Sequence, residues 1–356
     1  MTVVDSQDQS STNDFSVLIR NVTGSRGDTY TGLLIQTNSP THASSGFIQI
    51  VENTNGSYAA NLILAGKKIA FKGSFDVTGA ATSSVSGLDV TLLTDRDNGR
   101  ITGTVVGSNF ISELIAELPD VSSKWRGAYT LALSPADATA TNVPQGYGYA
   151  TLTVDRTGSG SLNCVLNDGT KLHTTAPLSI SGQWPLYVPL YKHAKVFDGA
   201  CIGWVSFATN AELTAVVDWF APVSMGYPAF TTTLTLDGSQ YTTGVSWPGA
   251  WDVTVSGGGL ASNLVKAVTI NAAGKVTVTN PGGDALKLNL ATTRALGQLI
   301  NPATKQLTPV FTGSFKPTAN GTAIPFTGLL LQRQKTGVGL FQMPTGQTGG
   351  VTLEIP

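Results

Sequence analysis

The chain has 356 residues, a net charge of −1 and only 12% charged residues. This balance excludes the basic surface with which proteins bind nucleic acid or anionic membranes, and no apolar run reaches the roughly 18 residues of a spanning helix. The 40 glycines, together with frequent Thr and Val, favour strands and tight turns over helices. The length suffices for two or three ordinary domains or one large β domain.

The N-terminal residues 1–27 are polar, and we expect a tail or linker there, with one short edge strand at 15–19. The first 14 residues lack the basic start and apolar core of a signal peptide. Either a signal peptide was removed and a Met added, or this chain is a module of a longer protein.

From residue 30, alternating apolar and polar runs predict consecutive strands joined by short turns, which makes sequence neighbours antiparallel. The segment 109–118 fits a helical stripe or a strand buried on both faces, and its strand neighbours favour the strand. The expected strands of this part are 30–36, 45–51, 57–64, 68–77, 88–93 and 100–106. The segment Asp95-Arg96-Asp97-Asn98-Gly99 approaches a calcium loop but lacks the distal Glu, so we interpret it as a hairpin turn.

The middle of the chain continues the pattern, interrupted by an aromatic and proline-rich segment at 183–191 that predicts an edge strand or a bulge. After Gly257-Gly258-Gly259, interpreted as a hinge between units, the alternation resumes up to residue 355. The further expected strands are 127–134, 146–154, 161–166, 171–180, 200–207, 213–220, 229–236, 265–270, 275–279, 286–290, 309–315, 324–332, 338–342 and 351–355.

Two short sequence motifs, here called words, each occur once near the N-terminus and once near the C-terminus, and their order along the chain is reversed between the two ends. One turn pattern also recurs three times. The words are Phe71–Phe75 with Phe311–Phe315, and Thr31–Gln36 with Thr327–Gln332; the turns are Asn53…Gly56, Asp155…Gly158 and Asn271…Gly274. Recurrence of this kind indicates related units. We predict a tail at 1–27 and β units at 28–123, 124–258 and 259–356, the third completing the barrel begun by the first.

So many short strands with local connections predict an all-β fold. Long antiparallel sheets manage their exposed edges by closing on themselves. We expect an antiparallel meander that closes into one large or two smaller β-barrel-like units, with the termini close together.

Candidate catalytic and metal-binding residues are sparse. His42, His173 and His193 are scattered, no hydrolase or phosphate-loop motif occurs, and we expect no cofactor or metal. Glu113 and Glu117 could form the pair of carboxylates that glycoside hydrolysis needs, although surface charges are the simpler interpretation. Cys164 and Cys201 lie in apolar runs, which favours buried free thiols over a disulfide.

The aromatic segment is the best candidate for binding. Trp184, Tyr187 and Tyr191, and more loosely Trp204 and Trp219, would offer a stacking platform for a sugar or another flat apolar face. These rings alternate with Leu, Val and Pro, as core residues do, so a plug or lid of the barrel is the favoured alternative.

Several words of the chain resemble a family of β-rich repeats in very large secreted or cell-surface bacterial proteins. They are Ser44–Phe47, Phe71–Phe75, Gly146–Tyr149, Gln183–Tyr187, Ile202–Trp204, Phe326–Gln332 and Gly337–Gly339, and the resemblance covers about residues 28 to 356. It implies a barrel-like, extracellular, adhesion-type module without catalytic residues.

The sequence thus favours a non-catalytic structural or adhesive module, with neighbouring modules of a longer chain and a glycan or other surface ligand as its partners. A β-barrel that binds a glycan or an apolar small molecule in its lumen is the alternative. An unrecognised hydrolase is the second.

Overall fold

The computed structural model describes residues 2–4, 10–12, 27–122, 124–137, 139–224, 226–242, 248–272, 276–278, 287–291, 310–318 and 321–356. Antiparallel strands build almost all of it, and one short 3₁₀ helix, η1 (His42–Ser44), is present among these residues. Besides a small hairpin of β1 (Thr2–Val4) and β2 (Ser10–Thr12), the strands form three sheets of eight. The all-β prediction is confirmed.

The first sheet contains β3 (Asp28–Ile35), β4 (Gly46–Glu52), β5 (Ser57–Leu64), β6 (Lys67–Ser74), β7 (Ala80–Val85), β8 (Leu88–Asp95), β9 (Arg100–Val106) and β10 (Ile111–Glu117). The second contains β11 (Gly127–Pro135), β12 (Gly148–Val154), β13 (Ser159–Val165), β14 (Lys171–Pro177), β15 (Gln183–His193), β16 (Val196–Phe207), β17 (Glu212–Ala221) and β18 (Phe230–Gln240). The third contains β19 (Gly249–Gly257), β20 (Leu264–Ile270), β21 (Val276–Val278), β22 (Lys287–Ala291), β23 (Val310–Phe315), β24 (Ile324–Leu331), β25 (Thr336–Gln342) and β26 (Thr348–Glu354).

All three sheets follow one plan, in which the first strand pairs with the last. β3 pairs with β10, β11 with β18, and β19 with β26, while every other pair joins sequence neighbours. Each sheet is therefore a curled meander whose two edge strands are not paired with each other. We call this gap the seam: it lies between β6 and β7 in the first sheet, β14 and β15 in the second, and β21 and β22 in the third.

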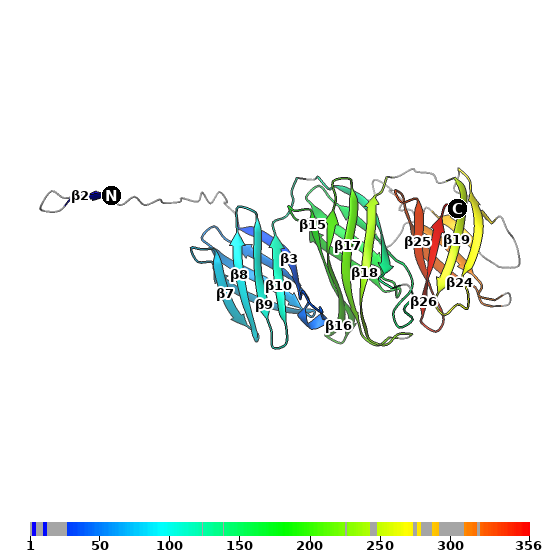
Figure 1. Ribbon diagram of the computed structural model, residues 1–356, viewed down its shortest axis with the longest axis horizontal. Coiled ribbons are helices and arrows are strands. Elements are labelled where there is room, and N and C mark those ends of the chain that lie inside the picture. Colours follow the sequence, from blue (N-terminus) through cyan, green and yellow to red (C-terminus); the bar gives the residue numbers. More distant parts are fainter. Residues whose placement is uncertain are drawn as a thin grey trace.

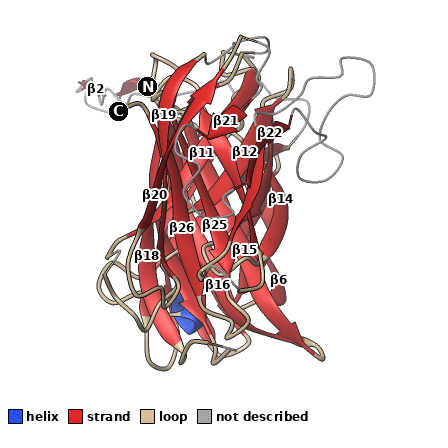
Figure 2. Cartoon of the chain, turned by 90° about the vertical axis from the view of Figure 1, so that its right-hand side faces the viewer, coloured by secondary structure: helices blue, strands red, loops and turns tan. Residues whose placement is uncertain are grey.

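The first two sheets are nearly closed barrels, here called the first and second barrels, and the third sheet is a half-barrel. The three stand side by side in a row with the second barrel in the middle (Figure 1). Their strands run across the row in roughly one direction, as the view turned by 90° also shows (Figure 2). The barrel-like fold class is confirmed, with three units instead of the one or two expected.

Strands that meet water on one face point alternate side chains into the interior. In β8, Leu88, Val90 and Leu92 are buried and the residues between them are exposed. The strand pleat produces this pattern when one face packs on a core and the other meets water. The interiors of both barrels are continuous clusters of aliphatic and aromatic side chains, so each barrel is a packed core and not a channel.

The prediction that the two ends of the chain complete one barrel is wrong. Thr31–Gln36 belongs to β3 in the first barrel, whereas Thr327–Gln332 belongs to β24 in the third sheet. They lie on either side of the second barrel in Figure 1, and the first strand of each sheet pairs with the strand seven positions later, the last of the same sheet.

The repeated word has another structural cause. Leu34 and Leu330 face the cores of their own sheets, while Leu33 and Leu329 face the second barrel. A strand buried on both faces reads as a continuous apolar run. The word therefore marks the two strands through which the outer units contact the middle one.

The hinge assigned to Gly257-Gly258-Gly259 is also wrong. All three glycines have positive φ, and Leu260 N–H donates to Gly257 C=O at 3.1 Å, which makes this segment the turn between β19 and β20. β19 pairs with β26, so the third sheet begins before the predicted boundary at residue 258.

Two other local predictions are confirmed. The ambiguous segment 109–118 is the strand β10. The turns Asn53…Gly56 and Asp155…Gly158 both join the second strand of a barrel to the third, with the glycine in the left-handed region. Asn271…Gly274 extends beyond the described residues.

Candidate functional site

The pleat of β15 separates the aromatic residues predicted as one platform. Trp184 points into the second barrel, and Tyr191 packs against the same core. Tyr187 and Trp204 lie on the outer wall, in the cluster shared with the first barrel. Trp184 and Tyr187 face opposite sides of the sheet because even and odd positions of a strand alternate. Tyr191 departs from this alternation: its φ is 54°, outside the extended region, and its ring packs on the core with Trp184. The predicted rings therefore do not share one surface.

Trp184 closes the seam of the second barrel. Its indole Nε1 donates to Ala176 C=O on β14 at 2.9 Å, across the gap where the backbone ladder is missing. The ring lies over Gly160 of β13, where an added Cβ would come within 2.4 Å of the indole nitrogen. The side chain is completely buried, which matches the interpretation of the ring as a barrel plug.

Tyr191 bridges the same seam at its other end. Its hydroxyl donates to Asp168 Oδ2 at 2.8 Å, on the turn between β13 and β14, and accepts from the indole Nε1 of Trp219 at 3.0 Å. Burial, and then the neighbouring carboxylate of Asp168, raises the pKa of Tyr191. The phenol is therefore a structural donor at neutral pH.

Tyr191→Phe is expected to lower the free energy of unfolding of the second barrel by about 1–3 kcal/mol, because it leaves the buried Trp219 N–H without an acceptor. Urea denaturation measured by tryptophan fluorescence would show it. Asp168 accepts hydrogen bonds from Thr170 as well as from Tyr191. Asp168→Asn keeps one acceptor oxygen, so we expect it to lower the free energy of unfolding less than Tyr191→Phe does. Equal stability of the parent and Tyr191→Phe would contradict the bridging role.

The first barrel bridges its seam with residues that the sequence did not reveal. Tyr58 of β5 extends over Gly73 of β6, and its hydroxyl is hydrogen-bonded to the Ser83 hydroxyl of β7 at 2.9 Å. Gly73 is the middle of the Phe71–Phe75 word. Its lack of a side chain makes room for the ring, since a Cβ there would lie 2.7 Å from the tyrosine oxygen.

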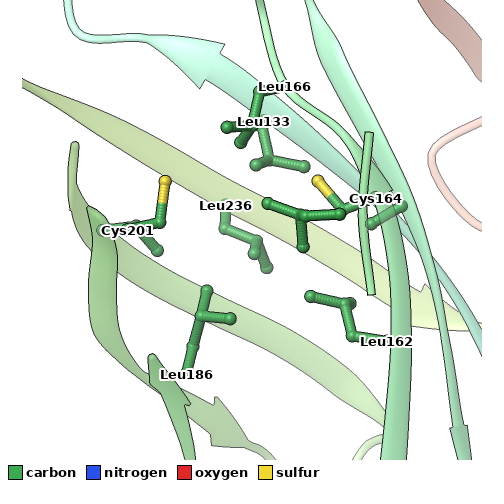
Figure 3. Close-up of a pocket in the computed structure, with 10 residues that line it drawn as sticks. Leu133, Leu162, Cys164, Leu166, Leu186, Cys201 and Leu236 are labelled. Atoms are coloured by element: carbon green, nitrogen blue, oxygen red, sulfur yellow. The ribbon is translucent and has the colours of Figure 1, made fainter. Parts of the chain in front are cut away.

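A small cavity lies at the apolar centre of the second barrel. Its volume of about 10 Å³ is at the lower limit for one water molecule. Leucines surround it, and Cys164 and Cys201 face it from different strands (Figure 3). This cavity is too small for a sugar ring or a lipid, so a ligand in this lumen is excluded.

Both cysteines are buried free thiols, as predicted. Burial raises the pKa of Cys164 and of Cys201 well above the ordinary range. Because the thiolate is the nucleophile and the metal ligand, these thiols are suited to packing and not to chemistry.

The carboxylate pair does not form a hydrolytic site. Glu113 and Glu117 lie four residues apart on β10, which places their Cα atoms about 13 Å apart at the rise of a strand. Glycosidase carboxylates are roughly 5–10 Å apart. Glu117 is buried and accepts a hydrogen bond from Ser181, whereas Glu113 is exposed.

The remaining candidates have structural roles. Within the part of the chain that is described, no group of three or more His, Cys, Asp or Glu side chains is placed to hold a metal. The segment 95–99 is the β8–β9 hairpin turn, in which Asn98 Nδ2 donates to Asp95 Oδ2 at 2.7 Å. Arg96 from this turn forms an ion pair with buried Glu52.

Asp218 gives a test of pH dependence. It is half-buried on β17, and burial raises its pKa. The folded state therefore holds this proton more tightly than the unfolded state, and the stability conferred by protonated Asp218 is lost as the pH rises through the raised pKa. Asp218→Asn is expected to be more stable than the parent at pH 7.

The difference between Asp218→Asn and the parent should shrink as the pH falls and Asp218 becomes protonated. Thermal unfolding between pH 4 and 8 would measure it, with exposed Asp237→Asn on β18 as the control for losing one negative charge. A difference that does not change with pH would contradict the assignment.

The contact between the first and second barrels combines apolar packing with backbone hydrogen bonds. Leu33 packs with Ile202 and Phe220, and Gly66 N–H donates to the Tyr187 hydroxyl at 3.0 Å. The connecting segment adds two bonds: Asp120 N–H donates to Leu178 C=O at 2.7 Å, and Ile180 N–H donates to Leu118 C=O at 3.0 Å. The linker is thus paired to the second barrel.

The contact between the second barrel and the third sheet follows the same principle. Leu329 and Leu340 pack against Tyr149. The Thr348 hydroxyl donates to Asn167 C=O at 2.7 Å, and Thr348 N–H donates to the Tyr227 hydroxyl at 2.7 Å. Buried, directional bonds of this kind fix one orientation of two packed units.

Comparisons with known proteins give little beyond the structure. No family model matches the chain. No curated protein matches it. A crystal structure of the vaccine antigen transferrin-binding protein B from Haemophilus parasuis Hp5 is similar over 93% of this chain and 75% of that chain, at 10% identity and a TM-score of 0.23. A TM-score this low does not establish a common fold.

Proposed function

We propose that this chain is a non-catalytic structural and adhesive module of a bacterial surface or secreted protein. In this role it holds its neighbouring modules at a fixed separation and orientation. Packed interiors and continuous contacts on both sides of the second barrel support the proposal, together with the resemblance to repeats of large bacterial surface proteins. No described helix has the length and apolarity to cross a membrane.

The main support for a structural role is that the second barrel contacts a neighbour on each side through buried apolar clusters and hydrogen bonds. Domain interfaces that are small and polar allow relative motion. Here Leu33 and Leu329 are almost completely buried between units, so the row behaves as one body.

Small-angle X-ray scattering of the full chain tests this directly. A rigid row gives one elongated particle whose pair-distance distribution matches the arrangement in Figure 1. An ensemble of bent conformers would overturn the proposal. So would hydrolysis of glycoside or ester substrates that Glu113→Gln or Glu117→Gln abolishes without changing the thermal midpoint.

A further inference from the structure

A surface groove on the first barrel is the strongest unassigned feature. It lies where β3 ends, beside the turn between β9 and β10, and its volume is about 670 Å³. Ligand pockets usually measure about 300–1,000 Å³. Its lining is Gln36, Thr37, Asn38, Thr104, Val106, Gly107, Ser108, Asn109, Phe110, Ile111 and Glu113.

The turn holds an apolar surface in the groove. Gly107 N–H donates to Phe110 C=O at 3.0 Å and closes the turn. The Phe110 ring lies against Gly107 so closely that an added Cβ would be 2.4 Å from it. The ring also packs on the core of the barrel, which fixes its position, while the neighbouring Ile111 is 61% exposed.

Uncommitted polar groups surround this apolar surface. In the described part of the chain, the side chains of Gln36, Asn38 and Asn109 are not hydrogen-bonded to any protein group. Each amide offers two donors and an acceptor. Glu113 is the one charged side chain of the lining, so the groove offers neutral hydrogen bonding beside an apolar surface.

The surrounding sheet excludes an extended peptide as the main occupant. β10 is paired with β3 on one side and with β9 on the other, and β9 is also paired on both sides. No strand edge is therefore free in the groove to pair with a peptide backbone. The lack of a cation in the lining likewise disfavours phosphate and other anions.

We propose that this groove binds a neutral oligosaccharide. The apolar face of a sugar ring would lie on Phe110 and Ile111, and its hydroxyl groups would bond to the amides of Gln36, Asn38 and Asn109. This inference rests on the adhesive part of the proposed function and assigns it to one end of the first barrel.

The test is calorimetric titration of the full chain with neutral hexasaccharides of β-1,4-glucose, β-1,4-N-acetylglucosamine and α-1,6-glucose, and with hexagalacturonate as the charged comparison. Binding of at least one neutral hexasaccharide is expected. Ile111→Asp should abolish it, and Gln36→Ala combined with Asn109→Ala should weaken it at least tenfold. Exposed Asn263→Ala at the other end of the row is the matched control and should bind as the parent does.

Three results would overturn the inference: no binding of any neutral hexasaccharide, binding of hexagalacturonate alone, or equal binding by the parent and Ile111→Asp. Circular dichroism decides whether each variant is folded. If Ile111→Asp unfolds the barrel, the double amide variant decides the matter. Small-angle X-ray scattering from the same samples tests the rigid row separately. A variant that loses sugar binding should keep the scattering profile of the parent.

Discussion

Replacing Trp184 with alanine is expected to lower the free energy of unfolding of the second barrel by about 3–5 kcal/mol, the usual cost of deleting a large buried aromatic ring. The ring fills the core beside Gly160. Its N–H donates a hydrogen bond to Ala176 C=O, which joins β15 to β14 near their connecting turn. The substitution therefore opens a void and removes a link across the seam. Its thermal midpoint should fall by about 10 °C or more.

Trp184→Phe separates the two contributions. Phenylalanine keeps most of the ring but leaves Ala176 C=O without its donor, which should cost about 1–3 kcal/mol. Val216→Ala, on the exposed face of β17, is the control and should change stability little. If Trp184→Ala leaves the thermal midpoint near that of the parent, the tryptophan is not part of the core, and a role as a binding surface gains support.

Leu33→Asp is expected to separate the first barrel from the second without unfolding either. Leu33 is 1% exposed, and its surroundings come from both barrels. An unpaired carboxylate at this contact should weaken it by about 3–5 kcal/mol. The radius of gyration should then rise, while circular dichroism retains the strand signal.

Two matched aspartates test the direction of this effect. Leu93→Asp lies on β8 of the same barrel, where the side chain is half-exposed, and should leave both shape and stability unchanged. Leu34→Asp, one residue further along β3, places the charge in the barrel core and should unfold the first barrel. If Leu33→Asp scatters as the parent does, this cluster does not hold the two barrels together.

The sequence predicted strand positions well wherever one face of a strand is exposed to solvent. Alternation located most of the strands, because the pleat converts burial directly into a period of two. It did not identify β7 or β19, and β10 was predicted from its strand neighbours. The role of Trp184 as a buried plug also followed from its alternation with aliphatic residues. The buried thiols of Cys164 and Cys201 were likewise predicted from their apolar surroundings.

The sequence was misleading wherever two different causes give the same pattern. Thr31–Gln36 and Thr327–Gln332 are alike because each strand is buried on both faces, and a pair of neighbouring strands would look no different. β3 and β10 pair although all the other strands of the first barrel lie between them in the sequence. Nothing in the local sequence of either strand indicates this pairing. The link from Tyr58 to Ser83 depends on Gly73 between them, a spatial relation that spacing does not express.

We infer that the two barrels and the third sheet form one rigid row. Backbone N–H residual dipolar couplings, measured on the deuterated full chain in a dilute aligning medium, test it most directly. We expect couplings from all three sheets to fit a single alignment tensor, with one orientation and one magnitude. Distinct tensors for the three sheets would show that the units move independently and that the row is not rigid.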